Sequence, residues 1–345
     1  YGSADQAREH TVRWAEEVSD TESLILPTEK RCEHVAEVDI LTNTGFVRPI
    51  DEQMAEWLAD ARPDLTFPQH AGESSDIRIA HCPERVLPGH VIRELVENDR
   101  VIGGMRLLCA DLACQLYEAV VEGELVKTTA RTAEMAKLAE NSFRDVNIAF
   151  ANELSTISHE LDIDVRELIA LANRHPRVNI LQPGAGVGGH CIAVDPWFIV
   201  NACPEQARLI RTARRVNDAK PLWVVDQVTA ALERIHQQRP DARRQDLTVA
   251  CLGIAFKPDI DDLRESPALQ IATDLAELGS RLRIVEPHID ALPAALQQPD
   301  VELTDIDTAI AEADVVCVLV RHKRFNGHIP QLQSHSALID VVGLT

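Results

Sequence analysis

The chain has 345 residues, of which 45% are hydrophobic, and its formal net charge at pH 7 is -21. This length and composition are typical of a globular protein with two or three domains. A negative charge of this size, with no basic stripe to interrupt it, argues against nucleic acid and anionic membranes as partners.

Eight cysteines are spread along the chain without a C-x-x-C pair. This spacing is typical of reduced thiols and indicates neither a zinc site nor a disulfide framework, so no resident metal is expected. No apolar run reaches the roughly 18 residues of a membrane span, and no signal peptide opens the chain. We therefore expect a cytoplasmic protein.

The first 50 residues are charged and weakly patterned, and only a short helix around 5–18 is expected there. The segment that follows, up to residue 128, mixes helical and strand patterns. Its expected elements are a helix over 52–58 that ends before Pro63, a strand over 77–82, a strand over 101–104 and a helix over 107–121.

The longest helical pattern runs from Thr129 to about Asp162 without Gly or Pro, and Thr132 is the candidate N-cap. At about 1.5 Å per residue this helix would be roughly 45 Å long, which suits a spine between domains or a dimer interface. Further expected elements are helices over 164–173, 204–217 and 220–235, and a linker over 237–246.

Beyond the linker, buried strand patterns alternate with helices. Strands are expected over 247–253, 282–287, 315–320 and 337–340, and helices over 267–278 and 306–311. This alternation is typical of an α/β domain with a doubly wound parallel sheet. Ligands bind beyond the carboxyl ends of such strands, where this chain has the segments 255–259 and 264–267.

A glycine-rich stretch between Pro183 and Pro196 contains four glycines within six residues and then His190, Cys191 and Asp195. Glycines let the backbone approach a ligand closely, so this loop could present Cys191 as a nucleophile. The alternative is a small buried cysteine that follows an ordinary turn.

Three further groups of polar residues could hold an anionic substrate. Lys137, Asn141 and Arg144 share one face of the long helix, although a solvated helix face is the alternative interpretation. Segment 173–179 brings two arginines and His175 just before the glycine loop, where surface ion pairs are the alternative. Lys257 and Arg264 stand at the mouth of the C-terminal sheet, where they would suit a pyrophosphate.

Three segments, 132–145, 186–196 and 256–267, together resemble the nucleotide-sugar 6-dehydrogenases, that is, the UDP-glucose/GDP-mannose dehydrogenase family. Segments 83–89 and 173–183 strengthen the likeness, which runs from about Asp51 to about Val320. The resemblance implies four parts: an unmatched segment over 1–50, part of a Rossmann-like NAD-binding domain over 51–128, a central helical and dimerisation domain over 129–236, and a UDP-sugar-binding α/β domain over 247–345.

The resemblance also implies a reaction, the NAD-dependent four-electron oxidation of a UDP-sugar C6 alcohol to a carboxylate by a homodimer. Cys191 would form a thiohemiacetal and then a thioester, which prevents the release of a half-oxidised aldehyde. Lys137 would exchange the proton of the C6 oxygen, Asn141 would support the oxyanion, and Asp195 and Glu84 would position water. The residues that would contact the nucleotide sugar are Arg85, Val86, Arg144, His175, Arg177, Gly188, Phe256 and Lys257. Arg264 would reach the NAD cofactor across the dimer.

Two features depart from the family pattern. No strand in the N-terminal part of the chain leads into a G-x-G-x-x-G turn that could hold the NAD pyrophosphate, and Gly343 lacks the lysine that usually precedes it. A second hypothesis is therefore a truncated, inactive protein that binds nucleotide sugar and dimerises without binding NAD. A third is a thiol acyl-transferase that uses Cys191.

Overall fold

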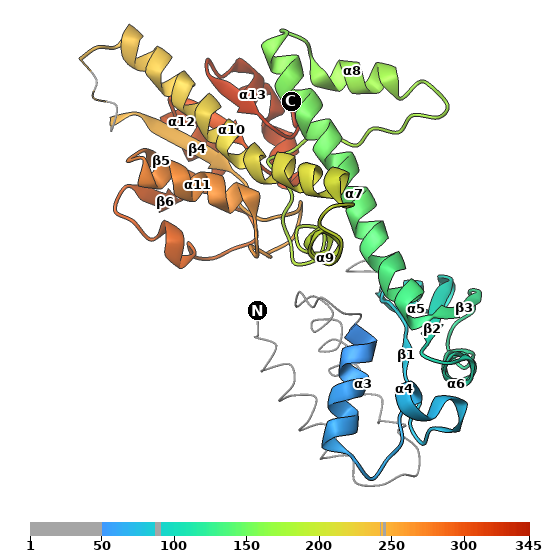
Figure 1. Ribbon diagram of the computed structural model, residues 1–345. Coiled ribbons are helices and arrows are strands. Elements are labelled where there is room, and N and C mark those ends of the chain that lie inside the picture. Colours follow the sequence, from blue (N-terminus) through green and yellow to red (C-terminus); the bar gives the residue numbers. More distant parts are fainter. Residues whose placement is uncertain (1–49, 87–90, 242, 244–245) are drawn as a thin grey trace. The chain divides into compact units, whose positions relative to one another are not determined.

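The structure is a computed structural model that describes residues 50–86, 91–241, 243 and 246–345. The helix expected around 5–18 lies outside the described residues. The chain divides into two compact α/β units (Figure 1). The first comprises Tyr1–Asn141 and Val194–Ala207, and the second comprises Ser142–Ala193 and Arg208–Thr345.

The first unit contains a three-stranded sheet in the order β1-β2-β3. β1 (Ala80–His81) pairs antiparallel with β2 (Arg100–Gly104), and β2 pairs parallel with β3 (Leu125–Thr129). A small apolar cluster joins this sheet to α6 through buried side chains of Ile102, Ala110 and Cys114. The helices that lie wholly in this unit are α3 (Ile50–Ala61), α4 (Pro68–Ala71), α5 (Val91–Glu97), α6 (Leu107–Tyr117) and α9 (Asp195–Ala202).

The structure corrects several of the elements expected in this unit. The strand expected over 77–82 shortens to two residues, and β3, α5 and α9 were not predicted. The helix expected to reach residue 121 ends at Tyr117, and a turn follows in which the N–H groups of Val120 and Val121 donate to the Tyr117 carbonyl at 2.9 Å.

The second unit is organised around a five-stranded sheet in the order β6-β5-β4-β7-β8, in which every neighbouring pair is parallel. The strands are β4 (Thr248–Leu252), β5 (Arg281–Val285), β6 (Val301–Leu303), β7 (Val315–Val318) and β8 (Leu338–Asp340). The layered helices are α11 (Pro267–Glu277), α12 (Ile306–Glu312) and α13 (Ile329–Ser334), shown with the sheet in Figure 1.

Helices cover both faces of this sheet, because successive strand residues point to opposite sides. Val249 and Cys251 of β4 pack in the core shared with α10 and α11. Ala250 and Leu252 pack in a second core with α12 and α13. The expected doubly wound parallel sheet is therefore confirmed; only β6 and α13 were missed.

The strand order places a topological switch point between β4 and β7, since the chain proceeds from β4 outward to β6 and then returns to β7 and β8. The loops that follow these two strands are in close contact. Gly253 has a φ of 86°, and a Cβ at this position would lie 2.5 Å from Cβ of Val320. Ligands of doubly wound proteins bind in the crevice that opens at such a point.

The remaining helices are two long ones, α7 (Ala130–Glu160) and α10 (Arg208–Gln238), and the short α8 (Val165–Ala172). The expected long helix is therefore confirmed, but its cap is not Thr132. The Thr129 hydroxyl accepts a hydrogen bond from the N–H of Thr132 at 3.2 Å, which is the interaction an N-cap side chain makes. Asp164 caps α8 in the same way through the N–H of Arg166 at 2.8 Å.

α10 is one continuous helix, whereas two helices separated near residue 218 were predicted. Pro221 lies inside it and cannot donate a hydrogen bond to the carbonyl of Asn217, one turn earlier. Buried side chains on both sides of the proline, such as Ala213 and Val224, give the packing that offsets this loss. Among the described residues, no helix is long and apolar enough to cross a bilayer.

Candidate active site

Lys137 meets the segment that carries Glu84 within the first unit. The Lys137 ammonium donates a hydrogen bond to the backbone carbonyl of Glu84 at 2.5 Å. The Glu84 carboxylate does not bind Lys137. It accepts hydrogen bonds from the backbone N–H of Arg85 (2.7 Å) and from the buried guanidinium of Arg100 (3.3 Å). Two of the predicted catalytic residues are thus adjacent, and Lys137 is held by a carbonyl rather than by a carboxylate.

Asn141 and Asp195 form the second predicted pair in this unit. The Asn141 amide donates to the Asp195 carboxylate at 2.5 Å, and Asp195 is 2% exposed. Asp195 begins α9, and Pro196 suits the first turn because its missing N–H has no intrahelical partner there. An amide has two N–H donors, so Asn141 keeps one that can be directed at a substrate oxygen.

Two predicted substrate-binding arginines lie on or beside α7. Arg85 is exposed and forms an ion pair with Glu140 at 2.8 Å. Arg144 is exposed on the part of α7 that belongs to the second unit, and Val86 is half-buried in the first. To bind a phosphate, Arg85 would therefore have to exchange Glu140 for the ligand.

The glycine-rich loop of the second unit is packed against the loop that follows β4. A Cβ on Gly188 would lie 2.4 Å from the Glu265 carbonyl oxygen and 2.9 Å from Cβ of Phe256. Gly189, with a φ of 84°, would place a Cβ 3.0 Å from the Phe256 ring. Only glycine fits here, and the close approach packs the loop that carries the half-buried Cys191 on the predicted substrate-binding Phe256.

The start of the same loop is anchored by a chain of buried amides. The Gly184 N–H donates to Oδ1 of Asn152 on α7 at 2.9 Å, and the Asn152 amide donates to Oδ1 of Asn217 on α10 at 2.9 Å. The carbonyl of Asn217, which Pro221 leaves without its usual helical donor, lies 3.3 Å from a Cβ built on Gly186. Sequence reasoning missed both asparagines because each one's partner is remote in the chain.

The remaining predicted residues are exposed. Lys257 projects beside Phe256, and Arg264 forms hydrogen bonds with the Asp262 carboxylate at 2.7 to 3.1 Å. These hydrogen bonds hold the pKa of Asp262 below its usual value. His175 and Arg177 lie in the loop after α8, which Asn173 closes by bonding both the N–H and the carbonyl of Ile180.

The doubly wound sheet, with the thiol loop packed on the loop after β4, places the protein in the class of doubly wound α/β proteins. Three domain models of one family match the chain: the NAD binding domain over residues 22–121, the central domain over 131–219 and the UDP binding domain over 250–345. The chain therefore belongs to the UDP-glucose/GDP-mannose dehydrogenase family, a family of NAD-dependent oxidoreductases. The match begins before Asp51 and continues past Val320, beyond the limits that the motifs indicated.

Individual relatives agree with this assignment. The chain is 60% identical over 295 residues to UDP-N-acetyl-D-mannosamine dehydrogenase of Yersinia pestis, covering 85% of this chain and 70% of the relative. It is 58% identical over 296 residues to NDP-N-acetyl-D-galactosaminuronic acid dehydrogenase of Ralstonia nicotianae, covering 85% and 67%. The solved structure of a UDP-D-ManNAc dehydrogenase from Pyrococcus horikoshii matches with a TM-score of 0.74 and 34% identity, covering 88% and 68%.

NAD is the cofactor of this family, which confirms the expectation from the resemblance. In the described part of the first unit, the turn from β2 into α6 has the strand, glycines and helix N-terminus that a diphosphate site needs. However, a Cβ on Gly104 would lie 2.3 Å from the Arg106 carbonyl, so this glycine allows close packing. The N–H groups of Leu107 and Leu108 already donate to the Glu73 carboxylate at 3.0 and 3.1 Å. This turn therefore does not fit the diphosphate of NAD.

Proposed function

We propose that the protein oxidises the C6 alcohol of UDP-N-acetyl-D-mannosamine to the carboxylate. The observation that carries the proposal is the packing of the Cys191 loop on Phe256, inside a domain that matches the family's UDP binding domain. The name of the Yersinia pestis relative supports this sugar. The Ralstonia nicotianae relative supports an N-acetylgalactosamine nucleotide as the second candidate.

The first oxidation needs a group that removes the proton of the C6 hydroxyl. We assign this role to the neutral amine of Lys137, which lies on a half-buried helix face and whose Nζ donates a hydrogen bond to the Glu84 carbonyl. The remaining N–H of the Asn141 amide, oriented by Asp195, would stabilise negative charge on the C6 oxygen. When bound, NAD supplies the acceptor for the hydride that leaves C6 in each of the two oxidations.

The second oxidation depends on the thiol of Cys191. Its thiolate adds to the C6 aldehyde to form a thiohemiacetal, and loss of a second hydride from C6 leaves a thioester. Water then adds to the thioester carbon, the C–S bond breaks, and the carboxylate and the thiol are released. Asp195 follows Cys191 by four positions in the sequence. Its carboxylate and that of Glu84 are proposed to position this water.

The nucleotide is proposed to bind through the residues that the family resemblance implied. Phe256 and Lys257 would contact it from the C-terminal domain, with Gly188 giving room for close backbone approach. Further contacts with the nucleotide sugar would come from Arg85, Val86, Arg144, His175 and Arg177, while Arg264 would contact NAD. Both Arg85 and Arg264 would have to release an acidic neighbour, Glu140 and Asp262, to do so.

We also propose a homodimer whose interface includes α7. In the second unit this helix exposes Phe143 (72%), Phe150 (52%) and Ile157 (45%) at intervals of seven residues. Apolar side chains at this spacing form one stripe that a second helix can cover. Replacing Phe143 and Phe150 together by glutamate should halve the mass measured by light scattering at micromolar concentration. An unchanged mass would place the interface elsewhere.

The activity is tested by measuring NADH formation and carboxylate product with UDP-N-acetyl-D-mannosamine and with UDP-N-acetyl-D-galactosamine. Two NADH per sugar are expected with the preferred substrate. A parallel calorimetric titration with NAD and with UDP separates the proposal from its alternative. Binding of UDP without binding of NAD, and with no turnover, would favour the inactive nucleotide-sugar-binding protein.

A further inference from the structure

The loop after β4, residues 253–259, carries Phe256 and Lys257 and borders the switch-point crevice. Two buried residues that follow other strands fix its two ends: Glu286, just after β5, and His322, beyond β7. We infer that Glu286 and His322 are positioning residues that hold this loop in its nucleotide-binding shape. The inference rests on the proposed function, since that function assigns the loop to the nucleotide.

Glu286 fixes the beginning of the loop and is 4% exposed. One of its carboxylate oxygens accepts hydrogen bonds from the N–H groups of Ile254 (2.8 Å) and Ala255 (3.0 Å). Burial alone would raise the pKa of Glu286, but the hydrogen bonds from His322 and these two N–H groups leave it below the usual value. The carboxylate is therefore ionised at neutral pH and binds the two amides strongly.

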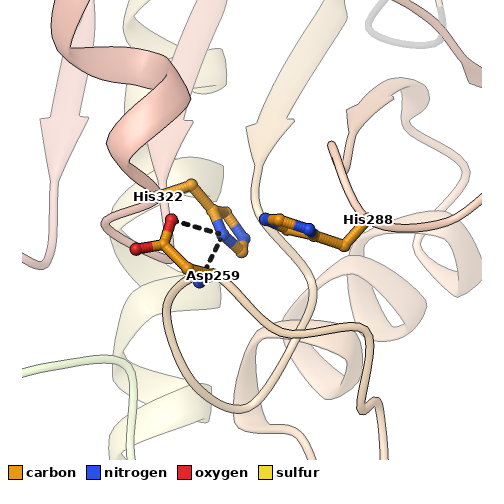
Figure 2. A group of neighbouring side chains, drawn as sticks. All are labelled: Asp259, His288 and His322. Atoms are coloured by element: carbon orange, nitrogen blue, oxygen red, sulfur yellow. Dashed lines mark hydrogen bonds and ion pairs between the residues drawn. The ribbon is translucent and has the colours of Figure 1, made fainter. Parts of the chain in front are cut away.

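His322 fixes the end of the loop and is fully buried. Its Nδ1 accepts a hydrogen bond from the N–H of Asp259 at 2.9 Å (Figure 2), and its Nε2 lies 3.1 Å from Oε2 of Glu286. An Nδ1 that accepts carries no proton, so Nε2 holds the ring proton and donates it to the carboxylate. This tautomer joins both anchors into one unit. The Asp259 carboxylate in turn accepts from the N–H of Lys323 at 2.9 Å.

The loop needs an anchor at its end because its backbone there is unfavourable. Asp259 has a φ of 61°, a left-handed conformation that is uncommon outside glycine, whereas glycine readily adopts the φ of 86° found at Gly253. Its side chains also support the Cys191 loop, since Gly188 and Gly189 pack directly on Phe256. A shift at either end would therefore move the predicted nucleotide contacts and the thiol loop together.

Figure 2 shows Asp259, His288 and His322 gathered with their potential ligand atoms within 4.8 Å of one another, an arrangement that invites comparison with a metal site. The hydrogen bonds argue against that interpretation. Both ring nitrogens of His322 are engaged, and the Asp259 carboxylate lies 3.2 Å from the Lys323 ammonium. His322 therefore has no lone pair to give a cation, and positioning is the role that fits its geometry.

His288 supplies a matched control. Its ring lies beside that of His322, with centroids 5.1 Å apart, and its Nε2 is buried without a hydrogen-bond partner among the described residues. Replacing it by leucine makes the same change of side chain at a neighbouring position without removing a hydrogen bond to the loop. Such a change is expected to be nearly neutral, because no paired group loses its partner.

The test compares the full-length chain with His322→Leu and His288→Leu by hydrogen exchange mass spectrometry and by calorimetric titration with UDP. For His322→Leu, peptides covering 253–262 should exchange about tenfold faster while β4 remains protected, and the dissociation constant for UDP should rise about tenfold. His288→Leu should match the wild type in both measurements. Unchanged exchange in 253–262, or equal acceleration in β4, would overturn the inference.

Two conservative variants separate the two anchors. His322→Asn can keep an acceptor near the Nδ1 position, and His322→Gln can keep a donor near the Nε2 position. We expect faster exchange mainly at 253–256 in the first and mainly at 257–262 in the second. The same pattern in both variants would contradict the two-anchor arrangement. Exchange requires no nucleotide, so failure of the wild type to bind UDP would count against the proposed function alone.

Discussion

Replacing Cys191 by alanine should reduce carboxylate formation at least about a thousandfold, which is roughly 4 kcal/mol of transition-state stabilisation. Without the thiol the C6 aldehyde has no covalent hold, so the second hydride cannot be lost from a thiohemiacetal. Lys137 and Asn141 remain in place in this variant, and the first oxidation should continue. Single-turnover experiments should therefore show one NADH per sugar instead of two.

Cys203→Ala is the matched control for this experiment. Cys203 is an exposed cysteine at the end of α9, where its side chain occupies no packed position. This variant should retain both NADH per sugar at the wild-type rate. A Cys191→Ala enzyme that still forms two NADH per sugar would rule out the thioester route. Mass spectrometry of wild-type protein quenched during turnover should detect the covalent sugar on the peptide that contains Cys191.

Much of the C-terminal domain could be predicted from local pattern. Runs such as 315–320 are continuously apolar, which is typical of strands buried on both faces, and the structure places their residues in the two cores. The candidate site residues could also be predicted locally, because Cys191 and Phe256 each lie in a distinctive sequence motif. In the structure the two motifs adjoin, because Gly188 and Gly189 pack on Phe256.

The residues that hold those motifs in place could not be predicted in this way. His322 contacts Glu286 across 36 positions, and Asn152 contacts Asn217 across 65, so neither pair leaves a periodic signal in the sequence. Pro221 was misleading for a related reason. Local propensity places a helix boundary near a proline, and long-range burial of the surrounding helix overrides that preference.

A buried ion pair between α7 and α10 is linked to the glycine loop by hydrogen bonds. Arg214 is 2% exposed and donates to Oδ1 of Asp145, which is 0% exposed, at 2.6 Å; its other nitrogen reaches Asp218. Neither Oδ2 of Asp145 nor Nε of Arg214 has a hydrogen-bond partner within the described residues. Burial raises the pKa of Asp145 even though Arg214 opposes the change. A pair that is only partly satisfied contributes little net stability.

The position of this pair indicates what it does instead. The Asn217 amide donates to Oδ1 of Asp145 at 2.8 Å, which fixes the orientation in which Asn217 accepts from Asn152. Asn152 then binds the N–H of Gly184 at 2.9 Å. The ion pair thus sets the direction of a hydrogen-bond chain that ends on the loop bearing Cys191.

Arg214→Met should lower the free energy of unfolding by about 3–5 kcal/mol at pH 7, measured by urea denaturation, because it leaves the Asp145 charge buried without its partner. The deficit should depend on pH. A folded-state pKa raised above the unfolded value means that ionisation of Asp145 opposes folding, so stability is present at low pH and lost as pH rises through the folded pKa. The buried Asp145 charge costs more in the variant, where Arg214 no longer opposes the effect of burial. Lowering the pH from 7 towards 4 should therefore reduce the difference in free energy of unfolding between Arg214→Met and the wild type.

The double variant Arg214→Met with Asp145→Leu distinguishes a lost charge partner from lost packing. It removes both charges and fills a similar volume with apolar groups, so it should be more stable than Arg214→Met alone, and its own free energy of unfolding should lack the pH dependence that Asp145 contributes. The double variant should still turn over more slowly than the wild type, since Asn217 has lost the acceptor that orients it towards Asn152 and Gly184. A double variant with wild-type turnover would show that the ion pair has no part in placing the Cys191 loop.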